Sequence, residues 1–369
     1  MPGFSWWQFA CLVVVLNGQV CAQPNAVPFV ASFERFARHQ EIDADIAGRL
    51  LFSELSCTAC HSATSGELKP KLGPRLDGVG NRLGHEWIAR FLDAPQKEKP
   101  GTTMPDVLAG FPDAGRGAAA RALAAFLSSR YDPFPNIKGN GARGVPHEFW
   151  MHGDVEQGRR LYHQVGCVAC HEAEEDYETL ETKPSPLDQL IEQLDEDELK
   201  ELGLSAASRR VPSVPHGNLV AKYSPQSLTF FLLDPHKTRT GGRMPNLKLG
   251  VVEAADIAAW LLRNSKSIRS PSEQPQEYRE NAIETGRRLF SELGCSSCHS
   301  VKGMSSPKMA KPLAQLSFSE PRSCVGAPRS GIPHFPLDSF QIGTLRSAMA
   351  DVRSDAAVAS NASPPPQLD

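Results

Sequence analysis

The chain has 369 residues, a formal net charge of -3 and an apolar content of 40%. This length suggests two or three domains, and the near-neutral charge gives no electrostatic basis for binding nucleic acid. Nine cysteines would suit a disulfide framework, but six lie in three short motifs and two lie near the N-terminus, which leaves only Cys324. Cysteine usage therefore argues against a disulfide-stabilised fold.

The first residues, 1–22, have the features of a secretory signal peptide. Residues 9–16 form a short apolar run, and the small residues at 20–22 fit the cleavage rule before Gln23, although the segment before the run lacks Lys and Arg. The run is too short to cross a bilayer, and no later stretch is long and apolar enough for a transmembrane helix. We expect a periplasmic protein without a transmembrane segment, whose mature chain starts with a leader over residues 23–40.

One pattern, C-x-x-C-H, occurs three times, and in each copy a glycine lies nine residues and an aromatic residue five residues before the first cysteine. This spacing is typical of covalent c-type haem attachment, with the histidine as an axial ligand of the iron. A zinc site needs four ligands close together and a redox dithiol needs a βαβ context, whereas these motifs are more than a hundred residues apart in helical sequence. We therefore expect three covalent haems, held by Cys57, Cys60 and His61, by Cys167, Cys170 and His171, and by Cys295, Cys298 and His299.

Apolar residues at helical spacing predict a helix over residues 42–55 and a second, alanine-rich helix over 118–130. Between them lie the first motif, a Gly-Pro pair that ends at Pro74, an aromatic helical segment and the pair Met104-Pro105. This order of elements over residues 41–131 resembles a class I cytochrome c domain.

The resemblance implies that Gly48 and Phe126 mark the crossing of the two helices. It also implies that Pro74 lies beside His61 and holds its ring through a backbone carbonyl. Met104 would then be the distal sulfur ligand of the first iron, which raises the reduction potential and fills both axial positions.

A linker rich in Pro and Gly is expected over residues 132–153, and the second domain, 154–264, repeats the arrangement. Pro215 stands in for the Gly-Pro loop, and Met244 precedes a proline as Met104 does. The main departure is an acidic insertion over 172–204, which we interpret as a solvated helix and loop. A docking surface for a basic partner is the alternative.

The third domain, 279–355, follows a second linker at 265–278 and opens like the second. Pro312 lies thirteen residues after His299, the spacing found in the first domain, but no Met-Pro pair follows. The closing helix lacks a central aromatic residue, and residues 356–369 are predicted to be a disordered tail.

The distal ligand of the third haem stays open at this point. Cys324 could supply a thiolate, which lowers the reduction potential, or be a small buried residue. His334 in its loop could supply an imidazole or lie at the surface. An open position at the third iron is the remaining alternative.

The resemblance implies an all-α protein of three class I cytochrome c modules in tandem, the third abbreviated. The expected function is relay of single electrons between periplasmic redox partners, with the redox chemistry supplied by the three haems. One alternative is a haem enzyme acting on peroxide or a sulfur compound at the third haem. Another is the cytochrome subunit of a periplasmic dehydrogenase. The expected partners are redox proteins that donate or accept electrons, among them a dehydrogenase or an oxidase.

Overall fold

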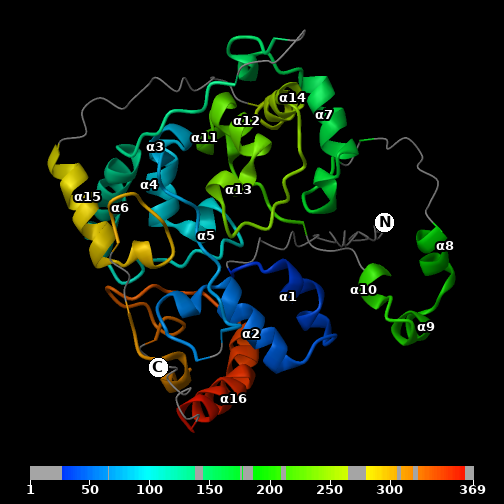
Figure 1. Cartoon of the computed structure of the whole chain (residues 1–369), viewed down its shortest axis with the longest axis vertical. Helices are drawn as coiled ribbons and strands as arrows, with labels where there is room; N and C mark the ends of the chain where they lie inside the picture. Colours follow the sequence, from blue (N-terminus) through cyan, green and yellow to red (C-terminus); the bar gives the residue numbers. More distant parts are fainter. Residues whose placement is uncertain are drawn as a thin grey trace, which may run out of the picture.

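The computed structural model describes residues 27–64, 66–137, 144–174, 177, 186–208, 213–264, 280–305, 309–318 and 323–361. These residues contain helices and loops, with isolated β-bridges in place of any strand, so the expected all-α class is confirmed. Three pairs of long helices form the frame (Figure 1): α7 Val155–Gln164 with α14 Val251–Leu261, α6 Asp113–Ser128 with α15 Glu280–Glu292, and α2 Ala44–Glu54 with α16 Ser339–Asn361.

The middle unit, residues 149–262, is continuous in sequence. Its two long helices cross where Gly158 has no side chain, since a Cβ there would lie 1.9 Å from the carbonyl oxygen of Asp256. Tyr162 and Trp260 pack beside this crossing with ring centroids 4.4 Å apart. The helices are η3 Phe149–Met151, α7 Val155–Gln164, η4 Cys167–Ala169, α11 Leu219–Lys222, α12 Pro225–Leu233, α13 Pro235–Thr238 and α14 Val251–Leu261.

The second unit combines residues 73–130 with residues 280–304. We call it the permuted unit, because the helix that leads into its motif, α15, follows its partner helix α6 in sequence, whereas in the middle unit the order is the reverse. Its crossing has the same form, because a Cβ on Gly286 would lie 2.0 Å from the carbonyl oxygen of Ala122. Phe126 and Phe290 pack beside it at 5.5 Å between ring centroids. The helices are α3 Val79–Arg82, α4 His85–Asp93, α5 Pro95–Glu98, α6 Asp113–Ser128, α15 Glu280–Glu292 and η5 Cys295–Ser297.

The outer unit joins the two ends of the described chain, residues 27–64 and 309–361. A Cβ on Gly48 would lie 2.1 Å from the carbonyl oxygen of Thr344 in α16, and Phe33 of the predicted leader packs edge-on against Phe340 of the same helix. The helices are α1 Ala31–Arg35, η1 Ala37–His39, α2 Ala44–Glu54, η2 Cys57–Ala59, η6 Leu313–Gln315 and α16 Ser339–Asn361.

The pairing of helices corrects one expectation. The predicted crossing of the helix at 42–55 with the helix at 118–130 is wrong, because α2 packs on α16 while α6 packs on α15. Gly48 and Phe126 mark two different crossings. A glycine indicates that a helix packs closely against another backbone, but it does not indicate which of three similar helices is the partner. The spacing of residues in the sequence therefore could not reveal that the partner helices are exchanged.

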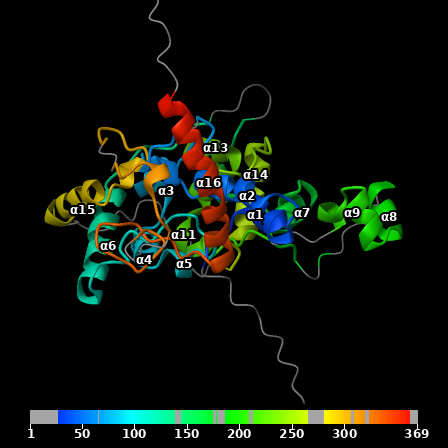
Figure 2. The same ribbon diagram turned by 90° about the horizontal axis from the view of Figure 1, so that it is seen from below.

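Helices α8 Pro186–Gln193, α9 Glu196–Glu201 and α10 Ser205–Ser208 form an acidic arm, residues 186–208, at one side of the molecule (Figures 1 and 2). An Asp195–Glu198 capping box starts α9. Helix α16 continues to Asn361, into the range predicted as a disordered tail. The predicted signal peptide and the linker at 265–278 lie outside the described residues. None of the described helices has the length and apolar character needed to span a bilayer.

Candidate functional site

All three C-x-x-C-H motifs adopt the same local structure. Each forms a short 3-10 turn directly after a long helix, entered through a residue with a positive φ angle. Each histidine donates a hydrogen bond from Nδ1 to a backbone carbonyl oxygen that lies far away in sequence. The bonds run from His61 to Lys311 at 2.7 Å, from His171 to Val214 at 2.9 Å and from His299 to Pro74 at 2.8 Å.

These hydrogen bonds fix the tautomer of the three rings. A carbonyl oxygen can only accept, so Nδ1 carries a proton in each ring, and the neutral form of such a ring has its lone pair on Nε2. Burial lowers the pKa of His171 and of His299, and the carbonyl partner of each opposes this only in part. The two rings are therefore neutral imidazoles with Nε2 ready to bind a metal ion.

The carbonyl partners differ from the sequence prediction at two of the three motifs. Pro74 holds the ring of His299, so its predicted pairing with His61 is wrong. His61 instead bonds to Lys311, the residue before Pro312. The exchange of helices causes both changes, because each proline loop stays with the closing helix of its own unit.

The distal candidates follow the same exchange. Met104 packs in the apolar cluster that contains Cys295, and Met244 packs in the one that contains Cys167. Cys324 lies in the cluster of Cys57. Met104 thus belongs with His299, and Cys324, proposed from sequence for the third motif, belongs with the first.

His334 lies at the contact between two units. Its backbone forms an antiparallel bridge with Asp106, with both N–H···O distances at 2.9 Å. The loop that follows Met104 in the permuted unit is thereby fixed to the loop that follows Cys324 in the outer unit. The two candidate distal loops support each other.

Residues 71–75, here called the bridging segment, connect all three units. The N–H of Lys71 donates to Ser53 just before the first motif at 2.9 Å, and the N–H of Gly73 donates to Cys298 at 2.8 Å. Arg75 donates to Thr238 of the middle unit at 2.8 Å. Three residues of chain span at most about 10 Å, so the first and third motifs are close neighbours.

The cysteine side chains support this proximity. Burial raises the pKa of Cys57, and the nearby thiols of Cys324, Cys298 and Cys60 raise it further, in that order. Burial also raises the pKa of Cys298, with Cys60 as its thiol neighbour. The seven described cysteines form no disulfide, so all six motif thiols are free to react.

Glu54 ties the bridging segment to the loop of Met244. Its carboxylate is 5% exposed, accepts a hydrogen bond from Lys71 Nζ at 2.6 Å and pairs with Arg243, the residue before Met244. Burial alone would raise the pKa of Glu54, but the hydrogen bonds from Arg243 and Lys71 outweigh it and hold the pKa below its usual range. One carboxylate therefore joins the first motif to the middle unit.

Glu54→Gln is expected to lower the free energy of unfolding at pH 7 by about 1–3 kcal/mol, because a buried acceptor loses its charge. The depressed pKa means that the stabilisation is complete above the unfolded pKa of about 4.3 and is lost as the pH falls through the folded value. Chemical denaturation of both proteins between pH 7 and pH 3 should show their difference shrinking only below about pH 4.3. Glu67→Gln, whose side chain is 84% exposed beside Arg49, should cost almost nothing, and a difference that persisted at pH 3 would contradict the role of the charge.

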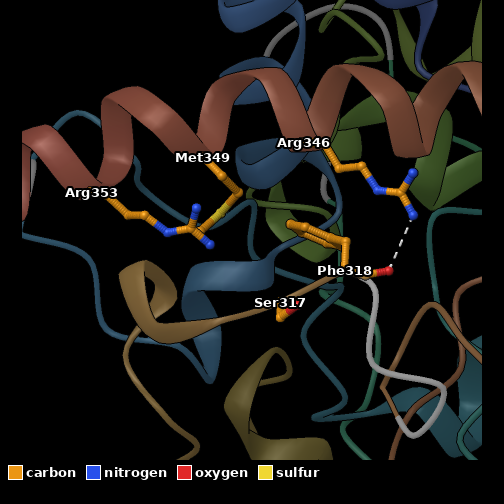
Figure 3. Close-up of a pocket in the computed structure, with 5 residues that line it drawn as sticks. All are labelled: Ser317, Phe318, Arg346, Met349 and Arg353. Carbon is orange, nitrogen blue, oxygen red and sulfur yellow. Dashed lines mark hydrogen bonds between the residues drawn. The ribbon is translucent and has the colours of Figure 1, made fainter.

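A pocket of about 250 Å³ opens beside α16 in the outer unit. Met349 projects from α16 toward Phe318, between two arginine side chains (Figure 3). Arg346 donates to the carbonyl oxygen of Phe318 at 3.3 Å, and Arg353 donates to that of Leu316 at 2.9 Å. Met349 is 2% exposed and belongs to the apolar core of the outer unit, so it is a packing residue.

Sequence reasoning gave no role to His216, which lies against the middle motif. Its ring stacks on that of His171 with centroids 4.1 Å apart, and its Nε2 lies 3.0 Å from the hydroxyl of Tyr162. Burial, together with His171, lowers the pKa of His216 to about 4. Its place directly after Pro215 was the signal that could have identified it, because that loop carries the carbonyl partner of His171.

The residues present fit a covalently attached haem at each motif. Every site offers two unpaired thiols and an imidazole held from behind at Nδ1. At the third motif Gly73 makes room for the histidine, since a Cβ there would lie 2.6 Å from Cε1 of His299. The chain matches no protein-family model, curated protein or solved structure.

Proposed function

We propose that this chain is a periplasmic c-type cytochrome that relays single electrons between redox partners. The observation that carries the proposal is the threefold repetition of one site, a C-x-x-C-H turn whose histidine is held at Nδ1 by a distant carbonyl. When bound, the haems supply iron that cycles between Fe(II) and Fe(III). The chain supplies the thiols, the imidazoles and the spacing between the sites.

The convergence of the three units on the bridging segment supports relay rather than independent storage. Through Gly73, Lys71 and Arg75 the segment contacts the third motif, the residues before the first motif and the middle unit. Because one short segment contacts all three units, electrons could pass from site to site within the molecule. The thiols of the first and third motifs influence one another, so we propose direct exchange between these two sites, which are not neighbours in sequence.

Ligand assignment is part of the same proposal. His299 and Met104 would hold one iron and His171 and Met244 another, in the permuted and middle units. His61 would hold the iron of the outer unit, where Cys324 and His334 are the distal candidates. Methionine opposite histidine fills both axial positions and favours electron transfer over substrate binding.

The proposal is tested on the exported holoprotein. Its denatured mass should exceed that of the processed polypeptide by three haems, and Cys167→Ser with Cys170→Ser should remove one. The reduced and oxidised spectra should not change when cyanide is added, because a distal ligand from the chain at each of the three sites would leave no position for it. A polypeptide mass without haem contradicts the cytochrome, whereas a cyanide-sensitive high-spin signal at one site supports the enzyme alternative.

The partners are proposed to be redox proteins, among them a dehydrogenase or an oxidase. The acidic arm gives a surface for a basic partner, because Glu196, Asp197 and Glu198 follow one another in the first turn of α9. Charge of this kind raises association rates at low salt.

A further inference from the structure

Four cationic side chains gather where the permuted unit meets the middle unit. They are Arg82 and Lys99 from the permuted unit and Lys222 and Arg239 from the middle unit; we call them the cation cluster. Lys222 is the most enclosed, with 7% of its surface exposed. Its Nζ lies 4.7 Å from the ring centre of Trp87 and 4.8 Å from that of Tyr223.

No described carboxylate forms an ion pair with any member of the cation cluster. The cations contact aromatic rings and neutral oxygens instead of carboxylates. Arg239, for example, lies 4.7 Å from the ring centre of Phe231 and donates a hydrogen bond to the hydroxyl of Tyr223 at 3.4 Å. Buried lysines are almost always paired. An unpaired cation that is enclosed among other cations indicates that an anion is part of the complete structure.

The shifted pKa values of two lysines agree with a missing anion. Burial lowers the pKa of Lys222 well below its usual range, and Arg239 and Arg82 lower it further. Burial lowers the pKa of Lys99 to about 7, with Arg239 and Lys222 as the next contributions. The cations repel one another, and negative charge placed among them would restore both pKa values.

The cluster is built from the same two positions in each unit. Arg82 and Lys222 are the last residues of the short helices α3 and α11. Lys99 and Arg239 are the residues that end α5 and α13, and each stands five residues before the candidate methionine ligand of its unit. The repeat therefore places two cations per unit at one shared boundary.

The boundary also lies beside the middle motif. The ring of His216 stacks on that of His171 with centroids 4.1 Å apart. The turn at Gly217 next to His216 abuts the permuted unit, since a Cβ on Gly217 would lie 3.3 Å from the carbonyl oxygen of Glu98. The anion thus belongs close to the group that His171 would hold.

We propose that the cation cluster is a shared carboxylate site, which takes the propionates of the groups attached at Cys167/Cys170 and at Cys295/Cys298. The proposal rests on the proposed haem attachment. Two porphyrins bring four carboxylates, which balance the four cations. A soluble dicarboxylate has the same chemistry, and the experiment separates the two sources.

The test is potentiometric titration of the three-haem holoprotein with Lys222→Gln and Lys99→Gln. Loss of a cation leaves a propionate unpaired, and its negative charge favours Fe(III). Two of the three reduction potentials should therefore fall, with a change of about tenfold in the equilibrium constant, or about 59 mV for one electron. The potential that disappears in the Cys57→Ser, Cys60→Ser variant identifies the outer site, which should stay unchanged.

Three controls complete the experiment. Lys222→Arg keeps the charge and should restore the wild-type potentials. Lys97→Gln and Lys237→Gln remove exposed lysines from α5 and α13 and should shift nothing. Succinate added to the wild type should also shift nothing, because the propionates already fill the site.

Each outcome can be interpreted separately. Unchanged potentials in both glutamine variants, or an equal shift of all three, would overturn the carboxylate site while leaving the cytochrome intact. A saturable effect of succinate that is lost in Lys222→Gln would show that the source is a soluble anion and overturn the propionate assignment. Absence of haem mass would overturn the proposed function and the site with it.

Discussion

Met104→Ala is expected to alter the iron site at Cys295 and Cys298 and to leave the site at Cys57 and Cys60 unchanged. Met104 packs in the cluster of Cys295, and His299 is held by Pro74 from the same stretch of chain. Loss of a methionine ligand removes a contribution that raises the potential. One of three potentials should fall by at least about 59 mV, a tenfold change in the reduction equilibrium, and the low-spin signal of that iron should change.

The assignment is decided in two-haem backgrounds. Met104→Ala should have its full effect when Cys57 and Cys60 are replaced by serine, and no effect on the remaining haems when Cys295 and Cys298 are replaced. Met309→Ala, at a methionine that is 67% exposed, serves as the matched control and should leave all potentials unchanged. The reverse pattern in the two backgrounds would restore the sequential pairing expected from the sequence.

Gly48→Ala is expected to destabilise the outer unit by about 1–3 kcal/mol, the usual cost of overfilling a packed contact. The new methyl group would lie 2.1 Å from the backbone oxygen of Thr344 and 2.7 Å from the Cβ of Ala348. Backbone cannot rotate away as a side chain can, so α2 and α16 must separate. Denaturant unfolding of the holoprotein, followed by helix content and by the spectrum of the outer iron, measures the loss.

The matched control lies on the partner helix. Gly343 of α16 has open space where a Cβ would be, so Gly343→Ala should stabilise the protein by about 0.5–1 kcal/mol through helix propensity alone. The two substitutions are chemically identical and should have opposite signs. Equal stabilisation by both would mean that α2 does not cross α16 at Gly48.

The local elements were predictable because their causes are local. Helical spacing indicated α2 and α6, and Gly48 indicated a close crossing; the structure has such a crossing at the glycine nine residues before each motif. The resemblance also indicated that a proline loop would supply a carbonyl partner for the histidine, and a residue at such a loop does so at each motif, although Pro74 serves His299 and not His61. The wrong prediction was which of the three similar units supplies the partner helix and the carbonyl group.

The exchange was not predictable because the units resemble one another. A helix that carries Gly48 or Gly286 finds a compatible surface on either α6 or α16, since small residues and backbone oxygens form both. Ranking the partners needs the packing of side chains that lie far apart in sequence. The cation cluster was missed for a related reason, because its four members come from two units and no single stretch displays them.

Because α2 pairs with α16, the three units are nested in sequence: the outer unit begins first and ends last, and the permuted unit encloses the middle unit. The middle unit is complete after Leu262, the permuted unit closes only with residues 280–304, and the outer unit closes only with α16. Contacts over such separations form late, because closing a long loop costs chain entropy first. A chain emerging from N-terminus to C-terminus would finish its units from the inside outward, so a premature stop before residue 339 would abolish the first unit to be synthesised and spare the other two.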